Sequence, residues 1–386
     1  MSKQNQLKEI HLSGKSYAIY KSNNGFDLYT DFSKKIILNN KNVINFLDKK
    51  KTKKKYKETD LFIGFFGYEL LNNLIGIKIP KQKSINFPKG IFYKPEKKIS
   101  YSNNLINYHT DKFRPKKKFK ININKKSYTK IFDKFKKKIK SGETYQIKIC
   151  TKYKLNSEID PLDFFCRLSR TNLAPEAFMI RDKNYSIISC SPENLITKKG
   201  STITTKPIAG TVRKNRKMNK LKASSYFRNN LKETKEHNMI VDMERSDMSR
   251  ICKVGSVKLS KKKVVEEYKD LFHYVSLIKG TIKNDIKNID IIKAMMPGGS
   301  VIGCPKISTL NLLNKQEKEN RNIYTGSFGY LKLNGDMKYN IIIRSILNFK
   351  NISEISVASG VVVDSNAKHE FGENFIKAKA LIDLFK

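Results

Sequence analysis

The stretch Lys232-Glu-Thr-Lys-Glu-His-Asn-Met-Ile-Val-Asp-Met-Glu-Arg-Ser-Asp-Met-Ser-Arg250 decides how the rest of the sequence is interpreted. Four of its side chains recur at i, i+3, i+4 and i+7, namely Glu233, Glu236, His237 and Ile240. That spacing predicts a helix with all of them on one face. Two carboxylates and an imidazole on one face are costly unless they meet a cation or line a hydrated cleft. The helix is therefore expected to face a functional site.

A second acidic helix is predicted near the C-terminus, where Glu370, Glu373 and Lys377 again fall at i, i+3 and i+7. Two helices that each offer a pair of carboxylates suit Mg²⁺, a cation that prefers oxygen ligands and shares them with anionic substrates. The alternative is a pair of solvated helix faces, which is common in a chain with 29% charged residues. The segments between the two helices favour the metal site.

The charge balance raises the question of nucleic acid. The chain has 386 residues, enough for two domains or one elaborate domain, and a formal net charge of +43. Clustered basic residues neutralise phosphates. Here, however, lysine greatly outnumbers arginine and is spread from end to end, whereas base readout favours arginine. We therefore expect no nucleic-acid partner and an enzyme acting on a small anion.

Cysteine usage and hydropathy indicate the compartment. The cysteines are Cys150, Cys166, Cys190, Cys252 and Cys304. They are isolated and lack C-x-x-C spacing, which favours reduced thiols in the cytoplasm. The first residues show no signal peptide, and the longest apolar stretch, 61–68, is far shorter than the roughly 20 residues of a membrane span. A cytoplasmic protein with no membrane partner is expected.

The order of elements predicts an α+β fold. Residues 1–124 form a predicted strand-rich N-terminal region, and a polar, basic segment separates it from a predicted catalytic domain at 125–386. Helices are predicted at 126–141, 164–170, 220–245, 271–278, 307 onward and 368–385. Strands are predicted at 17–20, 36–38, 61–68, 144–150, 177–180, 185–190, 202–205, 324–332, 337–346 and 355–363. Without regular β-α-β alternation, this order favours antiparallel sheets over a doubly wound fold.

Further segments add binding groups. Pro207–Thr211 offers a flexible Gly210 and the Thr211 hydroxyl, although a plain turn has the same appearance. The glycine-rich loop 298–306 precedes a predicted helix and supplies backbone donors for an anion, but it does not match a nucleotide P-loop. Arg344 lies in an apolar predicted strand and needs a carboxylate, either from a ligand or in a structural salt bridge.

Together these groups suit a small di- or tricarboxylate whose leaving group is assisted by Mg²⁺. No Ser-His-Asp or Cys-His arrangement has a recognisable context in this sequence. Nor does a G-x-G-x-x-G motif follow a predicted strand.

Five blocks carry a family resemblance: 207–211, 236–247, 297–306, 323–330 and 364–373. They resemble the signature segments of chorismate-utilising enzymes, which include anthranilate synthase component I, aminodeoxychorismate synthase component I, and isochorismate and salicylate synthases. The resemblance covers roughly residues 125–386, and Gly64–Tyr68 resembles an N-terminal element of the family. It implies an anthranilate-synthase-like complex α/β sandwich, with antiparallel sheets around a central site for chorismate and Mg²⁺.

The resemblance also implies roles for individual residues. The implied metal ligands are Glu236 and Glu373, with Glu233 and Glu370 holding metal-bound waters. The implied substrate-binding residues are Arg344, Tyr324, Gly360, Lys377, Gly299, Ser300, Lys306 and Gly210. The implied catalytic positions are His273, Gln146, Thr211 and Ala209, with His273 near the departing hydroxyl.

The choice within the family depends on two positions. Isochorismate and salicylate synthases have a lysine base where this chain has Gln146, so a water nucleophile is not activated and ammonia is expected instead. Many aminodeoxychorismate synthases carry a lysine where this chain has Ala209, which resembles anthranilate synthases and a subset of aminodeoxychorismate synthases. No covalent lysine intermediate is therefore expected. Two departures from the family pattern, Ala358 for glycine and Gly372 for an acidic residue, remove no matched ligand.

The predicted function is Mg²⁺-dependent amination of chorismate to 4-amino-4-deoxychorismate. The segments 145–146, 174–178 and 339–344 resemble aminodeoxychorismate synthase, and no Leu-Leu-Glu-Ser motif is present. Because the sequence contains no glutaminase-type Cys/His/Glu module, ammonia is expected from a separate glutamine amidotransferase subunit. The alternative within the family is anthranilate synthase component I. The alternative from another class is a basic nucleic-acid-binding protein with a decayed site, but carboxylates crowded around an absent metal would repel one another.

Overall fold

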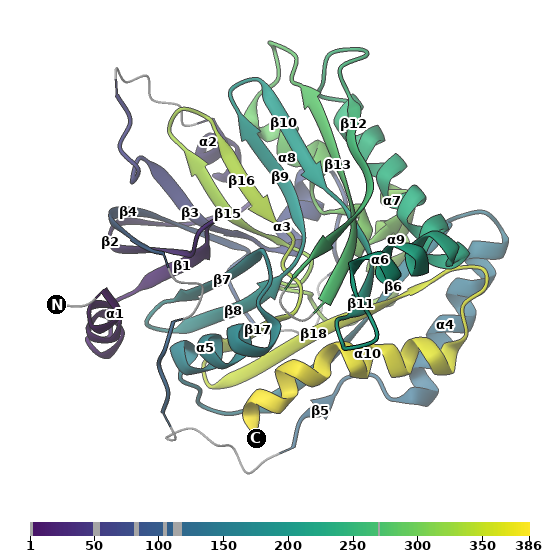
Figure 1. Cartoon of the computed structure of the whole chain (residues 1–386), viewed down its shortest axis with the longest axis horizontal. Coiled ribbons are helices and arrows are strands. Elements are labelled where there is room, and N and C mark those ends of the chain that lie inside the picture. The colour runs from purple at the N-terminus through teal and green to yellow at the C-terminus, as the bar shows by residue number, and fades with distance from the viewer. Residues whose placement is uncertain (1–2, 49–54, 81–84, 103–105, 111–117, 269–270) are drawn as a thin grey trace.

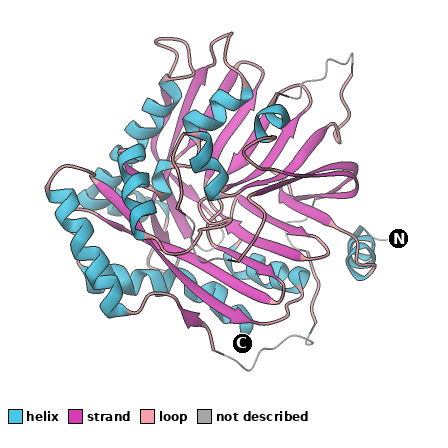
Figure 2. Ribbon diagram, turned by 180° about the vertical axis from the view of Figure 1, so that it is seen from behind, coloured by secondary structure: helices cyan, strands magenta, loops and turns pink. Residues whose placement is uncertain are grey.

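The computed structural model describes residues 3–48, 55–80, 85–102, 106–110, 118–268 and 271–386. Within these ranges the strands form one hydrogen-bonded network of antiparallel pairs, which curls around the middle of the molecule (Figure 1). Figure 2 shows helices around the outside of the curled strands. The mixture of helices with antiparallel strands confirms the expected α+β class.

The N-terminal strands belong to the same sheet as the later ones. They are β1 (Tyr17–Lys21), β2 (Phe26–Ile37), β3 (Leu61–Phe66) and β4 (Gly90–Tyr101). β2 pairs with β1 and β4, while β1 pairs with β7 (Glu176–Arg181) and β3 pairs with β15 (Ser327–Lys332). The sheet therefore crosses the expected boundary near residue 124, and the division into two domains stays a prediction.

Strand β6 (Gln146–Asn156) lies where the site forms. It pairs along its length with β18 (Ile352–Val361) and at its start with β14 (Gly303–Cys304). Around it are β5 (Lys120–Ile121), β8 (Tyr185–Ser191) and β17 (Ser345–Phe349). β17 joins β18 to β8, so segments far apart in the sequence become neighbours.

The prediction of a helix at 271–278 was wrong. These residues belong to β13 (Leu271–Thr281), which pairs with β10 (Thr202–Lys206), β11 (Ile208–Arg213) and β12 (Lys258–Glu267). The remaining strands are β9 (Asn194–Lys199) and β16 (Met337–Asn340). Residues Phe272–Ser276 are all buried, so the apolar–polar alternation that marks a half-exposed strand is missing from the sequence.

The helices are α1 (Lys3–Leu12), α2 (Val43–Leu47), α3 (Tyr68–Leu74), α4 (Lys125–Lys140), α5 (Pro161–Asn172), α6 (Lys220–Asn229), α7 (Leu231–Ser249), α8 (Asn288–Met295), α9 (Lys306–Gln316) and α10 (Ala367–Ile382). Short 3-10 turns occupy Gly299–Val301 and Asp383–Phe385. Both predicted acidic helices are confirmed as α7 and α10.

Asparagine side chains fix where the acidic helices begin. The Asn230 side chain accepts a hydrogen bond from the Glu233 backbone N–H at the start of α7. Asn366 accepts from the backbone N–H groups of Lys368 and His369 at the start of α10. Such caps satisfy donors that the first helical turn leaves free. α7 packs on β11 and β13, and α10 packs on β18 and α4, so each helix covers part of the sheet near β6.

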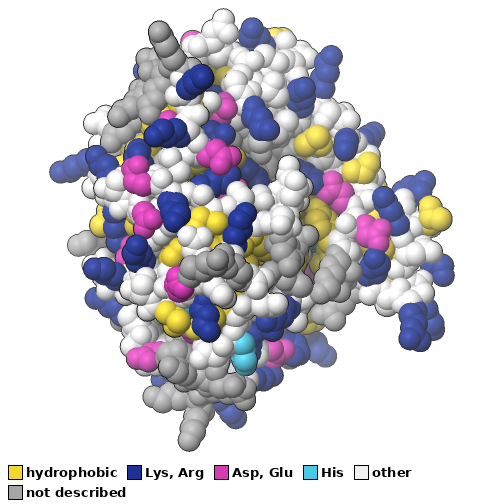
Figure 3. Space-filling view, turned by 60° about the vertical axis from the view of Figure 1, so that its left-hand side comes forward, with side chains coloured by type: hydrophobic (Ala, Val, Ile, Leu, Met, Phe, Trp, Pro, Cys, Tyr) yellow, Lys and Arg dark blue, Asp and Glu magenta, His cyan; other side chains and the backbone are white. Residues whose placement is uncertain are grey.

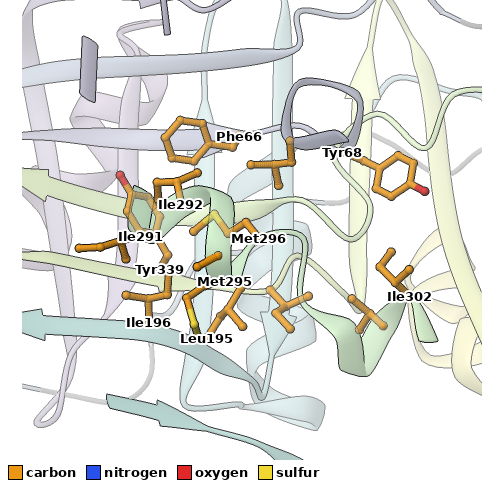
Figure 4. Packing of buried hydrophobic residues seen from close by; sticks show 14 of the residues in the cluster. Phe66, Tyr68, Leu195, Ile196, Ile291, Ile292, Met295, Met296, Ile302 and Tyr339 are labelled. Carbon is orange, nitrogen blue, oxygen red and sulfur yellow. The ribbon is translucent and has the colours of Figure 1, made fainter. Parts of the chain in front are cut away.

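The largest apolar cluster supports the loop before α9. Figure 4 shows Phe66, Ile196, Met296 and Tyr339 meeting from different elements, while Ile302 lies farther along the same cluster, at the right of the view. All five are nearly inaccessible to solvent. Close packing of this kind leaves little freedom for the attached backbone, so the cluster holds the 3-10 turn at 299–301 in place beside the site.

Among the described residues visible in Figure 3, basic side chains do not form a single stripe. On the face shown in Figure 3, lysine and arginine side chains are scattered, with acidic side chains between them. Separately, none of the helices in the described ranges combines the length and apolar character that crossing a membrane requires.

Candidate active site

A cavity of about 180 Å³ collects charged groups from several elements. Its lining residues are Lys148, Glu193, Ser300, Val301, Tyr324, Ile343, Arg344, Ser356, Val357, Ala358 and Lys377. They come from β6, the loop after β8, the turn at 299–301, the turn before β15, the link before β17, and from β18 and α10. The cavity therefore exists only in the folded chain.

A larger cavity of about 380 Å³ lies beside α4 and β6 and is less suited to an anion. Its arginine, Arg321, donates two short hydrogen bonds to Glu317, and its buried Lys152 lies 2.7 Å from Glu354. These cations are already neutralised within the chain. The smaller cavity is consequently the candidate active site.

Arg344 is the cation in the smaller cavity that has no partner among the described residues. Its guanidinium makes no hydrogen bond or ion pair with any residue that the structure describes, and burial lowers its pKa although the charge of Glu193 acts in the opposite direction. The structural salt bridge considered from the sequence is absent there. A carboxylate from a ligand would provide the missing partner.

The local backbone around Arg344 differs from the prediction. The strand expected at 337–346 is interrupted after Asn340, and Arg344 lies in the link before β17 with a φ of +50°. Its carbonyl accepts a hydrogen bond from the Cys190 N–H at 3.2 Å. Positive φ is unfavourable for a residue with a side chain, so strand packing on both sides holds this conformation.

Tyr324 lies in a turn rather than in the predicted strand, which begins only at Ser327. Its side chain is buried against Cys150 and Ala358 and lines the same cavity as Arg344. Two of the predicted substrate-binding residues are thereby brought together.

Glu236 is held by two residues of β6. Alternation along the strand places Gln146 and Lys148 on one face. The Gln146 amide donates to Glu236 Oε1 at 3.0 Å, and the Lys148 ammonium donates to the same oxygen at 3.2 Å. Lys148 is the main cause that lowers the pKa of Glu236 to about 2. This carboxylate is therefore ionised at neutral pH.

Helix α10 contributes a second charged pair. Lys377 lies 2.7 Å from Glu373 Oε1 and donates to the Ala358 carbonyl at 3.0 Å. Burial alone would raise the pKa of Glu373, but Lys377, a hydrogen bond with Glu370 and the charge of Lys148 together lower it. Glu373 is therefore held as a carboxylate.

The donor set fits a magnesium ion chemically. The charges of Glu236 and Glu373 act on both Lys148 and Lys377. The acidic groups of α7 and α10 therefore face the same region. All four predicted ligands are carboxylates, the oxygen donors that Mg²⁺ prefers. Among the described residues, the ligand atoms of Glu370, Glu373 and His369 lie within 4.8 Å of one another.

Glu193 was missed by the sequence reasoning. It follows β8 and accepts a 2.6 Å hydrogen bond from Ser300, another predicted residue of the cavity. Burial raises the pKa of Glu193 to about 7. The signal was present in the sequence, because a glutamate two residues after the buried strand Tyr185–Ser191 is an expensive residue to bury.

Thr211 and His273 form a pair next to this cavity, without lining it. They are directly opposite each other in β11 and β13, and Thr211 Oγ1 lies 3.0 Å from His273 Nδ1. Burial, with a further contribution from Arg344, lowers the pKa of His273 to about 3. The imidazole is therefore neutral and available for hydrogen bonding.

Two of the predicted glycines leave space that neighbouring side chains fill. Gly210 has a φ of +84°, and a Cβ there would lie 2.9 Å from Glu233 Oε2. At Gly360 a Cβ would lie 2.9 Å from the Lys148 ammonium and 3.1 Å from the Gln146 amide nitrogen. In both places the missing side chain leaves room for charged groups of the site.

Ala209, Gly299 and Lys306 are, like Thr211 and His273, predicted residues that do not line the cavity. Ala209 packs with Ile240 and Met243, and a Cβ on Gly299 would lie 2.0 Å from Met243 Sδ. Lys306 was expected to bind substrate, but its ammonium lies 2.6 Å from Asp247 and 3.0 Å from the Ala294 carbonyl. The positive charge of Lys306 is thus neutralised by Asp247 inside the protein.

Comparison with known proteins identifies relatives. A family model described as chorismate binding enzyme matches residues 14–383. The chain is 33% identical over 255 residues to aminodeoxychorismate synthase component 1 of Bacillus subtilis, covering 66% of this chain and 54% of that protein. It is 35% identical over 263 residues to anthranilate synthase component 1 of Arthrobacter globiformis, covering 67% and 50%. The chain thus spans about half the length of these two relatives.

Solved structures show the same fold. Anthranilate synthase component I from Streptococcus pneumoniae superposes with a TM-score of 0.77 at 25% identity, covering 95% of this chain and 90% of that chain. The isochorismate synthase MenF from Escherichia coli also gives a TM-score of 0.77, at 16% identity and with coverages of 96% and 89%. The expected anthranilate-synthase-like fold is confirmed at this level.

Proposed function

This chain belongs to the chorismate binding enzyme family, and we propose that it catalyses the amination of chorismate to 4-amino-4-deoxychorismate with Mg²⁺ as cofactor. The observation that carries the proposal is the guanidinium of Arg344, which has no partner in the described part of the chain and shares its cavity with a protonatable carboxyl, Glu193. A dicarboxylate with a hydroxyl leaving group would provide a carboxylate partner for Arg344 and a proton acceptor for Glu193.

Cations of the cavity bind the substrate. Arg344 and the buried Tyr324 receive one carboxylate of chorismate, and Lys377 lies on the other wall beside Ala358. An arginine bound to a carboxylate through two parallel hydrogen bonds also fixes the orientation of the ring. Positioning of this kind lowers the entropic part of the barrier.

The nucleophile is ammonia rather than water. Activating water requires a base, and the two candidates on β6 are unsuited to that role. Gln146 has no basic nitrogen. Burial alone would lower the pKa of Lys148, but the carboxylates around it raise that pKa, so the side chain stays an ammonium with no free lone pair. Ammonia carries its own lone pair and needs no such base. We propose that it comes from a separate glutamine amidotransferase subunit.

Glu193 supplies the proton for the leaving group. Its carboxyl, with a pKa of about 7, donates to the departing hydroxyl, which leaves as water. When the new C–N bond forms, nitrogen loses a proton, and Glu193 takes one back. The sum is chorismate plus ammonia giving aminodeoxychorismate plus water. His273, neutral beside Thr211, provides a hydrogen-bonding group close to Arg344.

Glu236 and Glu373 would hold the magnesium ion, with Glu233 and Glu370 one helical turn away. Bound there, the ion would neutralise a substrate carboxylate and assist loss of the hydroxyl. The carboxylates themselves are kept ionised by Lys148 and Lys377.

The choice of product rests on the sequence segments around the site. Residues 145–146, 174–178 and 339–344 resemble aminodeoxychorismate synthase. Ala209, packed against Ile240 and Met243, favours direct addition of ammonia over a covalent lysine intermediate. Anthranilate synthase component I remains the second candidate, because relatives of both kinds match at similar identity.

A product assay tests the proposal. The protein is incubated with chorismate, ammonium at high pH and Mg²⁺, and the products are separated by chromatography. We expect aminodeoxychorismate, which becomes aromatic only after a lyase is added, whereas anthranilate is fluorescent at once. Glu373→Ala should abolish turnover, while Lys368→Ala, an exposed position on the same helix, should leave it unchanged. Absence of any amino product would refute the proposal.

A further inference from the structure

The Lys148 ammonium contacts the Glu236 oxygen that would bind the proposed metal ion. Its ammonium lies 3.2 Å from Glu236 Oε1, and its side chain is 13% exposed. The strand carrying it is anchored, since Arg321 donates to the Lys148 carbonyl at 3.0 Å. Neither the helix periodicity of α7 nor the family resemblance pointed to this residue.

The position of the ammonium is built into the sheet. Gly360 is the partner of Lys148 in the pairing of β6 with β18. A Cβ at Gly360 would lie 2.9 Å from the ammonium nitrogen, so the glycine provides the space that the charged group fills. The Gln146 amide, 3.0 Å from Glu236, holds the same carboxylate from the neighbouring position.

We propose that Lys148 is an internal cation that occupies Glu236 in the metal-free protein and competes with the divalent ion for that carboxylate. The inference rests on the proposed function in that it takes Glu236 as a metal ligand. Two cations that share one carboxylate oxygen repel each other strongly in a site of low dielectric constant. Metal binding therefore requires the ammonium to leave Glu236.

Other carboxylates are within electrostatic reach of the displaced ammonium. Lys148 is attracted by Glu373 and by Glu193 as well as by Glu236. Glu193 and Lys148 line the same cavity. When the ammonium moves from Glu236 toward one of these carboxylates, the lysine charge stays inside the site. The need for this move lowers the affinity of the protein for the metal ion in the absence of substrate.

Metal binding without substrate tests the proposal directly. Mn²⁺, used in place of Mg²⁺, is titrated into the wild-type protein, Lys148→Met and Lys148→Gln, with free Mn²⁺ measured by electron paramagnetic resonance. We expect both variants to bind Mn²⁺ at least tenfold more tightly than the wild type. Lys154→Met is the matched control, because Lys154 lies on the same strand and pairs with Glu319 outside the site. It should bind Mn²⁺ as the wild type does.

Thermal melts with and without Mn²⁺ accompany the titration. Each Lys148 variant should gain more thermal stability from the ion than the wild type gains. Unchanged or weaker Mn²⁺ binding by variants that melt cooperatively would overturn the proposal, and so would absence of binding in every protein. If the variants do bind more tightly but no protein converts chorismate, the inference about Lys148 stands and the proposed reaction fails.

Discussion

Replacing Arg344 with methionine separates substrate binding from folding. Methionine has a similar length and no charge, and it faces the same positive φ as any residue with a side chain. The guanidinium has no partner within the described chain, so its removal breaks no internal ion pair. If Arg344 exists to bind a substrate carboxylate, activity should fall while the fold is unharmed.

The expected loss of kcat/KM in Arg344→Met follows from the strength of charge-assisted hydrogen bonds. Each bond to a charged group contributes about 1.5–3 kcal/mol, so losing a bidentate pair costs about 3–6 kcal/mol. At about 1.4 kcal/mol per factor of ten, kcat/KM should fall by roughly 10² to 10⁴.

The stability of Arg344→Met should rise although its activity falls. A buried cation without a partner is costly, and replacing buried charge with an apolar group is often stabilising by about 1 kcal/mol or more. Arg344→Met is therefore expected to raise the free energy of unfolding slightly. Arg321 is the matched control, a fully buried arginine paired with Glu317 at 2.6 Å. Arg321→Met leaves that carboxylate unpaired and should cost about 3–5 kcal/mol.

Urea melts and steady-state kinetics on the two variants provide the measurement. The kinetics use chorismate, ammonium and Mg²⁺, and the melts are repeated with chorismate added. Chorismate should stabilise the wild type but not Arg344→Met. The reasoning fails if Arg344→Met loses several kcal/mol of stability while its kcat/KM stays within threefold of the wild type.

Further predictions concern Glu193, Lys152 and Gly360. The pKa of Glu193 is raised by burial to about 7, above its unfolded value, so its stabilising contribution is complete below pH ~4.5 and is lost as pH rises through 7. Glu193→Gln should flatten that part of a pH–stability curve from urea melts and lower kcat at least 100-fold, whereas an unchanged curve would contradict the assignment. Lys152→Met removes the 2.7 Å partner of Glu354 in the core, leaving the longer 3.8 Å pair with Lys154, and should cost about 3–5 kcal/mol in urea melts; a loss below about 1 kcal/mol would show the pair to be unimportant. Gly360→Ala should displace Lys148 and Gln146 and lower kcat/KM at least tenfold with little change in melting temperature, and wild-type kinetics would refute this.

Local sequence patterns were enough for the acidic helices and the fold class. Helical periodicity identified α7 and α10 because each has one side packed on the sheet, which imposes the 3.6-residue repeat on the sequence. The same reasoning failed at β13, where residues on both faces are buried and no repeat distinguishes a strand from a helix. The resemblance of several blocks to one family indicated chorismate as the substrate class.

Tertiary structure alone decided which charges remain available. The sequence presented Arg344 and Lys306 as comparable cations, yet Lys306 is neutralised by Asp247 while Arg344 has no partner among the described residues. It also revealed Glu193 and Lys148, whose roles depend on residues more than 80 positions away, Ser300 and Glu236. A residue type and its spacing fix the chemistry a side chain can perform. Its pKa and its partner are set by burial and by neighbours that only the folded sheet brings together.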